Sequence, residues 1–372
     1  MKIAVIKLGA RITINNKSSS GGTGETINCI KLLINAGHTV DAYTNILKKD
    51  EFHDDFNIIH IFDNFKNINS LNYDALIVLN GNANFFGGKE DLLSIYNYKI
   101  INQFEGNIYY FLCDPNLMLK QIWKSVYSKS WGKKYSKDEL YITRNDLRLV
   151  TQCRNTQDTL FLANKNEEFF NMCTYYPFEK FPLLTQPEYE ISSVKSKEYD
   201  ILYGGTFRSG KREKDMINFF FGYPEDIKVE MFGNIELKNF NENLIKEKRI
   251  PFFNKPVAYN NFGNKMSTSI STIAIGDVIY KKLDDLAQRI YESIQYGNIV
   301  FIDKSYDINM RVFKDNKLKE FCYVSDKNDV INRINQIKTN PNLYEELVYL
   351  QRNDVKFTKE ESNIILDLAL SD

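Results

Sequence analysis

The stretch Tyr203–Arg212 reads Tyr-Gly-Gly-Thr-Phe-Arg-Ser-Gly-Lys-Arg, which combines paired glycines with two arginines. The apolar run before it predicts the end of a strand, and the periodic segment after it predicts a helix. Glycines let backbone N–H groups approach an anion, and a helix start adds its positive dipole end. Arg208 and Arg212 are four apart, so a helical turn would place both on one side, where they could clamp phosphate. The alternative is an exposed turn with solvated basic residues.

A second set of polar residues follows the predicted strand Thr272–Ile275. Asp277 and Tyr280 come directly after it, and Arg289 and Glu292 are three apart on a predicted helix, so they share a face. An arginine can hold a phosphate, and a carboxylate can accept two vicinal ribose hydroxyls. The alternative is a surface ion pair that contributes little.

Two carboxylates stand at positions suited to catalysis. Asp114 ends the run Tyr-Tyr-Phe-Leu-Cys-Asp-Pro, at the C-terminal end of a predicted buried strand, where active sites of parallel sheets lie. It could act as a general base, or it could cap a turn. Glu25 starts a predicted helix after a Ser/Gly-rich loop, where acidic residues are also favoured by the helix dipole alone.

The loop Asn84-Phe85-Phe86-Gly87-Gly88-Lys89 places two aromatic side chains beside a lysine. Exposed aromatics next to a basic residue can stack on a nucleobase, although both phenylalanines could instead be buried. The three histidines have no metal-ligand spacing and no nucleophile partner, so we predict no metal site.

Composition sets the broad class. The chain has 372 residues, a formal net charge of zero and five cysteines without a C-x-x-C pair. Neutrality argues against coating nucleic acid by bulk charge but allows a local basic surface. The odd cysteine count favours a reducing cytoplasm. No run approaches the roughly 18 apolar residues of a membrane span, and the N-terminal run fits a first strand better than a signal peptide.

Strands and helices alternate along the chain, with continuous apolar strands, which predicts an α/β protein with parallel sheets covered on both faces. In the N-terminal half strands are expected at Lys2–Leu8, His38–Tyr43, Ile58–Phe62, Ala75–Leu79 and Ile108–Leu112, and helices at Glu25–Asn35 and Glu90–Ile101. Two further stretches, Leu149–Thr151 and Leu160–Leu162, are possible strands. In the C-terminal half strands are expected at Tyr199–Tyr203, Ile227–Phe232, Thr272–Ile275 and Ile299–Ile302, with helices at Lys211–Phe221, Leu283–Ile294, Asn328–Thr339, Leu343–Arg352 and Thr358–Leu370.

These patterns predict two doubly wound, Rossmann-like domains facing each other across a cleft. We expect an N-terminal domain over 1–180, a linker over 181–198 and a C-terminal domain over 199–354.

Taken together, Tyr203–Glu213, Asn84–Lys89, Glu25-Thr26-Ile27 and Ile275-Gly276-Asp277 make the chain resemble the DNA β-glucosyltransferases of T-even bacteriophages. The resemblance runs from Met1 to about Arg352. It implies the two-domain GT-B fold, with residues 1–180 as the DNA-binding domain, 199–354 as the UDP-sugar domain, and a C-terminal helix at 355–372 returning to the first domain. It also implies transfer of glucose from UDP-glucose to 5-hydroxymethylcytosine in duplex DNA, with inversion.

The resemblance assigns roles to individual residues. Asp114 corresponds to the general base and Glu25 to a carboxylate near the donor sugar. The other correspondences are Gly205, Thr206 (in place of serine), Arg208 and Arg212 for the diphosphate; Phe232 and Val257 for the uracil; Asp277 and Tyr280 around the donor; Arg289 and Glu292 for phosphate and ribose; Glu179 for the acceptor side; and Asn84, Phe85, Phe86, Gly87 and Lys89 for the flipped base.

The chain also departs from the family pattern on the acceptor side. Pro115-Asn116 replaces a basic position, and Trp123–Ser136 is rebuilt. The resemblance further implies base flipping, a monomer without membrane association, a phage protein in the cytoplasm of its host, and a divalent ion, Mg²⁺ or Mn²⁺, assisting the diphosphate. Other GT-B transferases with a different sugar or acceptor, and a non-catalytic nucleotide-sugar or DNA-binding protein, remain the alternatives.

Overall fold

The computed structural model describes residues 1–7, 21–44, 55–60, 69, 71–80, 103–112, 148–154, 174–208, 212–233, 235–236, 252–358 and 361. The chain divides into two compact units: unit 1 comprises Met1–Phe181 and Lys359–Asp372, and unit 2 comprises Pro182–Thr358. The segment expected to be a linker belongs to unit 2 from Pro182 onward, where it forms α6 (Pro182–Thr185) and a 3-10 turn at Val194–Ser196. The predicted helix at Thr358–Leu370 lies outside the described residues except at Thr358 and Glu361.

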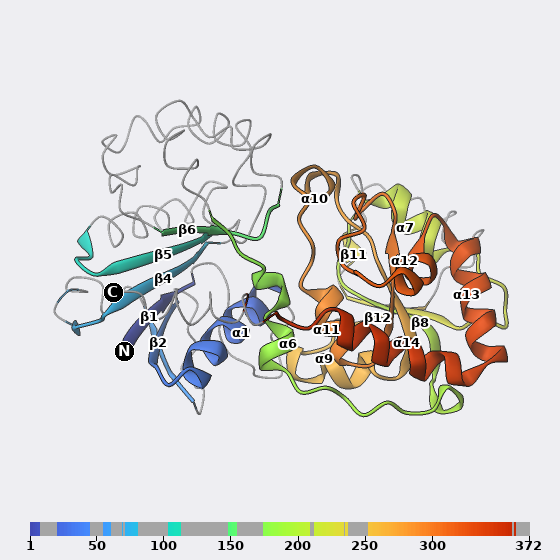
Figure 1. The fold of residues 1–372 in the computed structure, drawn as a ribbon, viewed down its shortest axis with the longest axis horizontal. Helices are drawn as coiled ribbons and strands as arrows, with labels where there is room; N and C mark the ends of the chain where they lie inside the picture. The colour runs from blue at the N-terminus through green and yellow to red at the C-terminus, as the bar shows by residue number, and fades with distance from the viewer. Residues whose placement is uncertain are drawn as a thin grey trace. The chain divides into compact units, whose positions relative to one another are not determined.

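Unit 1 contains a seven-stranded sheet with the order β3-β2-β1-β4-β5-β6-β7. Its strands are β1 (Lys2–Ile6), β2 (Thr39–Thr44), β3 (Asn57–His60), β4 (Ala75–Asn80), β5 (Asn107–Leu112), β6 (Arg148–Thr151) and β7 (Thr174–Tyr175). Every described pairing is parallel, as predicted, and the strand boundaries shift by one or two residues. The order reverses between β1 and β4, and ligands bind beyond the strand ends at such a point (Figure 1).

Helix α1 (Gly21–Asn35) follows β1 and begins earlier than predicted. The glycines before Glu25 predicted a loop, but they form the first turn of the helix. Ile27, Ile30 and Leu33 recur along one face and are buried, and this packing outweighs the low helix propensity of glycine. Glu25 is therefore not in the first turn, so the helix dipole does not account for its position.

Unit 2 contains a six-stranded parallel sheet with the order β12-β10-β8-β13-β14-β15. Its strands are β8 (Tyr199–Gly204), β10 (Val229–Phe232), β12 (Phe252–Asn254), β13 (Ser269–Ala274), β14 (Ile299–Asp303) and β15 (Tyr323–Val324). A separate two-stranded sheet pairs β9 (Phe207–Arg208) with β11 (Ile235–Glu236). The order of the larger sheet reverses between β8 and β13, so the turns after these strands lie at the position where ligands bind.

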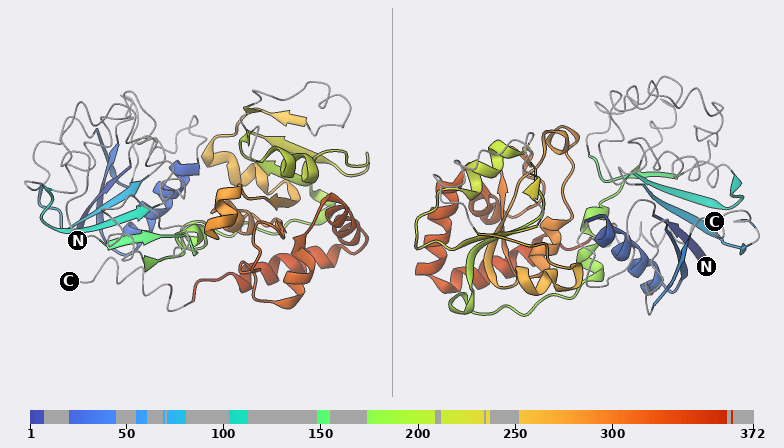
Figure 2. Two further views of the ribbon diagram at one scale, coloured as in Figure 1. Left: turned by 90° about the horizontal axis from the view of Figure 1, so that it is seen from above. Right: turned by 180° about the vertical axis from the view of Figure 1, so that it is seen from behind.

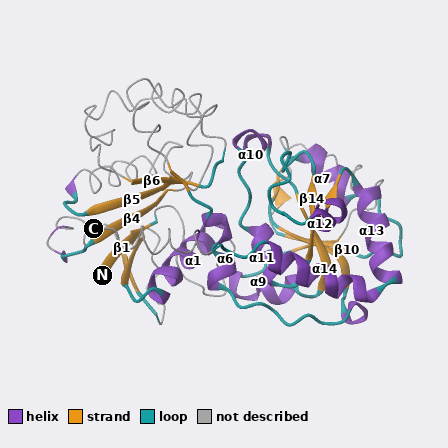
Figure 3. Cartoon of the chain, in the orientation of Figure 1, coloured by secondary structure: helices purple, strands orange, loops and turns teal. Residues whose placement is uncertain are grey.

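The helices of unit 2 surround this sheet (Figures 2 and 3). They are α7 (Glu213–Phe220), α9 (Tyr259–Met266), α10 (Val278–Leu283), α11 (Arg289–Gln295), α12 (Asn316–Cys322), α13 (Lys327–Thr339) and α14 (Pro341–Asp354). The single helix predicted at Leu283–Ile294 is wrong. Asp284 has a left-handed backbone with φ of 50° and pairs with Arg311 at 2.6 Å, which ends α10 and lets α11 begin at Arg289.

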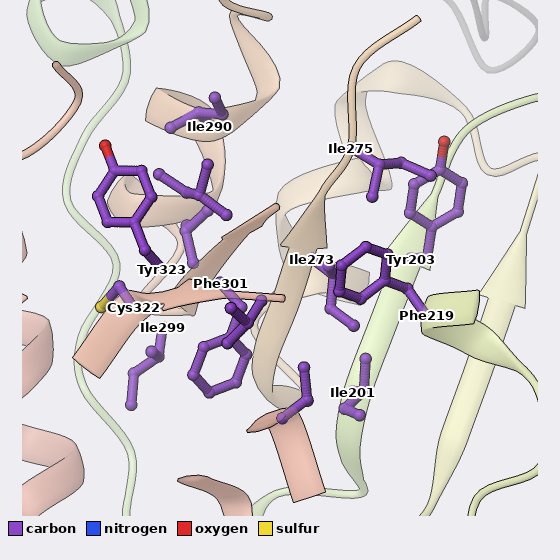
Figure 4. Close-up of a cluster of buried hydrophobic side chains, with 14 of the residues drawn as sticks. Ile201, Tyr203, Phe219, Ile273, Ile275, Ile290, Ile299, Phe301, Cys322 and Tyr323 are labelled. Atoms are coloured by element: carbon purple, nitrogen blue, oxygen red, sulfur yellow. The ribbon is translucent and has the colours of Figure 1, made fainter. Parts of the chain in front are cut away.

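The core of unit 2 follows the two-residue period of its strands. Ile201 and Tyr203 of β8 belong to a large cluster that also contains Phe219 of α7, whereas Leu202 belongs to a second cluster with Phe262 of α9. Alternate residues of a strand point to opposite faces, so α7 and α9 cover opposite faces of the sheet. Figure 4 shows the larger cluster around β8, β13 and β14. Within the described residues, no helix has the length and apolar character needed to cross a membrane.

Candidate functional site

The turn after β8 leaves no room for a side chain at Gly205. A Cβ atom there would lie 3.0 Å from Arg289 Nη1 and 3.0 Å from Tyr203 Oη. Gly233, which follows β10 with φ of +145°, approaches so closely that a Cβ on it would lie 1.8 Å from the Gly205 carbonyl oxygen. These glycines bring the backbone of the turn against the guanidinium of Arg289, and Thr206 follows half-buried.

Arg289 and Glu292 occupy the first turn of α11, as the spacing predicts. Glu292 is only 5% exposed and accepts a hydrogen bond from Tyr259 Oη at 3.3 Å. Burial raises the pKa of Glu292, while the positive charge of Arg289 and hydrogen bonds from Tyr259 and Gln186 oppose that rise. The carboxylate is buried and lies close to the positive charge of Arg289. Its oxygens can therefore accept hydrogen bonds from the hydroxyl groups of a bound ligand.

Phe232 at the end of β10 and Val257 before α9 lie in one apolar cluster, with Phe232 buried and Val257 partly buried. The ring of Phe232 packs against Phe262 with centroids 5.4 Å apart, and the Arg289 guanidinium lies 4.7 Å from the centroid of Phe262. Phe262 therefore contacts both the apolar cluster around Phe232 and the Arg289 side chain.

Arg212, Asp277 and Tyr280 form a second group at the same edge of the sheet. Arg212 Nε lies 3.9 Å from Asp277 Oδ2, and its guanidinium lies 5.5 Å from the Tyr280 ring centroid. Arg212 Nε is buried and makes no hydrogen bond among the described residues, which leaves a donor for an anion. Gly276 packs flat on Tyr306, since a Cβ on it would lie 2.1 Å from Cδ2.

The expectation that Arg208 and Arg212 share a helical turn is wrong. Arg208 lies in β9, and Arg212 is the N-cap residue of α7. Arg208 is opposite Glu236 in the two-stranded sheet of β9 and β11, which the chain forms before α7 begins. The side chain of Arg208 lies outside the described part of the chain.

In unit 1, Glu179 lies in a 3-10 turn (Phe178–Lys180) and is 1% exposed. Its Oε1 accepts hydrogen bonds from Arg154 Nη2 at 3.4 Å and from Tyr175 Oη at 3.3 Å. Burial raises the pKa of Glu179 to about 7, against the lowering effect of Arg154. Its charge therefore changes near neutral pH.

The remaining predicted residues of unit 1 are only partly described. Asp114, Asn84, Phe85, Phe86, Gly87 and Lys89 lie outside the described residues. Strand β5 ends at Leu112 in the inner part of the parallel sheet, two residues before Asp114. Glu25 is half-buried on α1, which follows β1 at the reversal of strand order.

Sequence reasoning missed several residues that contact the candidate residues of each unit. They are Gln186, Gly233, Tyr259 and Phe262 in unit 2, and Arg154 and Tyr175 in unit 1. Only Gly233 carried a signal, because a glycine directly after a strand indicates a special backbone position. Gln186, Tyr259, Phe262 and Arg154 act through contacts between residues far apart in sequence, whereas Tyr175 lies only four residues before Glu179. In the described residues, no group of three or more His, Cys, Asp or Glu side chains could hold a metal ion.

Comparison with known proteins agrees with this arrangement. Residues 1–182 match the family model described as bacteriophage T4 beta-glucosyltransferase. The DNA beta-glucosyltransferase of Enterobacteria phage T4 is 29% identical over 359 residues, which are 96% of this chain and 95% of the relative. The chain is related to the T4 β-glucosyltransferase family. The resemblance in the sequence is thereby confirmed.

Solved structures extend the relationship to the fold. T4 phage BGT in complex with UDP and Mn²⁺ has a TM-score of 0.72 and 26% identity, covering 99% of this chain and 98% of that chain. An alpha-glucosyltransferase in complex with UDP and a 13-mer DNA has a TM-score of 0.63 at 14% identity, covering 98% and 100%, which supports the fold alone. The predicted class, two Rossmann-like domains with parallel sheets, is confirmed.

Proposed function

We propose that this protein is a DNA glucosyltransferase that moves glucose from UDP-glucose to the hydroxyl of 5-hydroxymethylcytosine in duplex DNA, forming a β linkage. The observation that carries the proposal is the similarity to the T4 DNA beta-glucosyltransferase over 96% of the chain. The grouping of the predicted donor residues at the strand-order reversal of unit 2 supports it independently.

The donor nucleotide would bind along the edge of the unit 2 sheet. Arg289 and the backbone at Gly205 and Thr206 would hold the diphosphate, joined by Arg212 and Arg208. Glu292 would accept the ribose hydroxyls, and Phe232 and Val257 would flank the uracil. Asp277 and Tyr280 would line the donor site next to Arg212. A cationic, partly buried setting offsets the charge that grows on the leaving UDP.

The acceptor would be activated by residues of unit 1. Asp114 would remove the proton from the hydroxymethyl oxygen, which attacks the anomeric carbon on the face opposite UDP and displaces it in one step. This single displacement inverts the anomeric configuration and needs no covalent intermediate. Because a base inside a duplex cannot reach an enclosed site, the target base would flip out toward Asn84–Lys89, near Glu25 and Glu179.

No described cluster of His, Cys, Asp or Glu fits a resident divalent ion, so we assign no step to a metal. We expect Mg²⁺ or Mn²⁺, where present, to associate through the diphosphate, and we expect the protein to act as a monomer.

The deciding experiment is nucleoside mass spectrometry after incubation with UDP-glucose and duplex DNA containing 5-hydroxymethylcytosine. We expect one added hexose per modified cytosine, with the β configuration by NMR. Asp114→Asn should reduce the rate by about 10²-fold or more, because it removes the base without removing the side chain. UDP binding without hexose transfer to this base would overturn the proposed acceptor or sugar, and an α product would overturn the linkage.

A further inference from the structure

Helix α9 contacts both polar residues of the proposed nucleotide site. Its first residue, Tyr259, donates a hydrogen bond through Oη to Glu292 Oε1 at 3.3 Å. One turn later, Phe262 lies under the Arg289 guanidinium, 4.7 Å from the ring centroid. Neither side chain belongs to the donor residues assigned above. The helix therefore supports the Arg289–Glu292 pair from outside it.

Tyr259 is itself oriented by Gln186. Gln186 Nε2 donates to Tyr259 Oη at 2.9 Å, and the backbone carbonyl of Gln186 accepts from Gln295 Nε2 at 3.3 Å. A phenol has one proton. Since the amide nitrogen of Gln186 can only donate, the Tyr259 proton is directed at Glu292. This gives the chain of bonds a direction, from Gln186 through Tyr259 to the carboxylate. The Gln186 side chain also hydrogen-bonds the carboxylate directly.

We propose that Tyr259, held by Gln186, is a positioning residue that fixes the carboxylate of Glu292 for recognition of the ribose hydroxyls. The inference rests on the proposed function, because it assumes that Glu292 meets a ribose. With one lone pair of Oε1 taken by Tyr259, the plane of the carboxylate is set, and its remaining lone pairs face a defined direction. A buried acceptor in a fixed orientation discriminates strongly against a ligand that lacks the matching hydroxyl.

The environment of Glu292 gives the hydroxyl of Tyr259 a second role. Within the described part of the chain, the charged and titratable groups that face the carboxylate are Arg289 of α11, Tyr296 directly after α11, and Tyr259 of α9. The hydrogen bond from Tyr259 opposes the rise in the pKa of Glu292 that burial causes. In Tyr259→Phe, which lacks that bond, the carboxylate should become protonated at a higher pH than in the wild-type protein. As the solution is acidified, UDP binding by the variant should therefore begin to weaken at a higher pH than UDP binding by the wild type.

The test is calorimetric titration of the full chain with UDP and with 2′,3′-dideoxy-UDP. The wild-type protein should prefer UDP, and Tyr259→Phe should reduce that preference about fivefold to tenfold, the size expected for the loss of one typical intramolecular hydrogen bond. Gln186→Met removes the hydrogen bond to Tyr259 and the direct one to Glu292, so it should reduce the preference in the same direction. Tyr223→Phe is the matched control: its hydroxyl donates to the Phe219 carbonyl oxygen at 2.7 Å in the same unit, and the preference should stay unchanged.

The outcomes separate this inference from the proposed function. A wild-type protein that binds neither nucleotide overturns the proposed function. A wild-type protein that prefers UDP, with the full preference kept in Tyr259→Phe, overturns the positioning role while the proposed function stands. Equal loss of affinity for both nucleotides in Tyr259→Phe also overturns it, because the hydroxyl would then support the whole pocket and not the ribose contact.

Discussion

Among single residues, Glu179 should make the free energy of unfolding depend on pH. Its folded-state pKa of about 7 lies above the ordinary value of 4.5, so the folded protein binds more protons than the unfolded chain between these values. The free energy of unfolding should therefore fall as pH rises through that window. Relative to wild type, the free energy of unfolding of Glu179→Gln should rise by on the order of 2 kcal/mol between pH 5 and 8, since each unit of pKa difference corresponds to about 1.36 kcal/mol.

Urea unfolding at several pH values checks this. His38, whose pKa burial lowers, titrates in both proteins and cancels in the comparison. Arg154, Lys180, Tyr175 and Tyr176 also face the carboxylate. Burial raises the pKa of both tyrosines, so neither of them changes charge over this range. Parallel stability curves for the two proteins would show that Glu179 is ionised in the folded state at acidic pH, contrary to this reading.

The candidate residues differed in how well the sequence could place them. Arg289 and Glu292 were predicted to share a helix face because a three-residue spacing is a local property, and they do. The grouping of Arg208 with Arg212 failed because a tertiary pairing, β9 with β11, took one of them into a strand. The support from Tyr259 could not be predicted, since it lies 33 residues from Glu292 in sequence.

Among the elements of unit 2, Lys281 of α10 links α7 and β14 beside the proposed donor site. Its Nζ lies 3.0 Å from Asp215 Oδ2 of α7 and 3.2 Å from Asp303 Oδ2 at the end of β14. Lys281→Met leaves the buried Asp303 without this cation, so we expect a loss of about 1–3 kcal/mol in the free energy of unfolding. Because Arg212 precedes α7 and Tyr280 lies in α10, UDP affinity should fall as well.

Lys317→Met is the matched control for Lys281→Met. Lys317 pairs with Glu346, and both side chains are about half exposed, at 47% and 56%. An exposed ion pair contributes about 0.5 kcal/mol or less, so urea unfolding should hardly change. Equal losses in the two variants would mean that the Lys281 contacts are screened like any surface pair.

Element prediction succeeded where burial is continuous and failed where it is brief. Strand β14 is buried at every residue, and its apolar run was recognised within one residue. Strands β12 and β15, of three and two residues, are too short for a periodic signal and exist because neighbouring strands pair with them. The break between α10 and α11 depends on one left-handed residue, Asp284, which a helical pattern does not reveal.

At the scale of the whole molecule, the sequence predicted two α/β domains because the strand–helix alternation begins again near Tyr199. Both sheets have the strand order of a doubly wound fold, with a reversal at one internal point. The amino-acid composition did not indicate which acceptor the protein uses. A formal net charge of zero gives no long-range attraction to a polyanion, so the proposed DNA binding would have to come from a local surface.

The affinities for duplex DNA and for UDP should therefore depend differently on salt concentration. Duplex DNA binding that neutralises even two phosphates should weaken about tenfold between 50 and 200 mM salt, since the logarithmic slope is about −0.9 per phosphate. In the proposed site UDP would meet partly buried groups such as Arg212 and Arg289, whose interactions salt screens less, so its affinity should change less than DNA affinity does. Fluorescence anisotropy for DNA and calorimetry for UDP, over the same salt series, make the comparison. A flat DNA response would mean that base and sugar contacts dominate recognition, because a neutral chain without a local phosphate-binding surface has no other source of salt dependence.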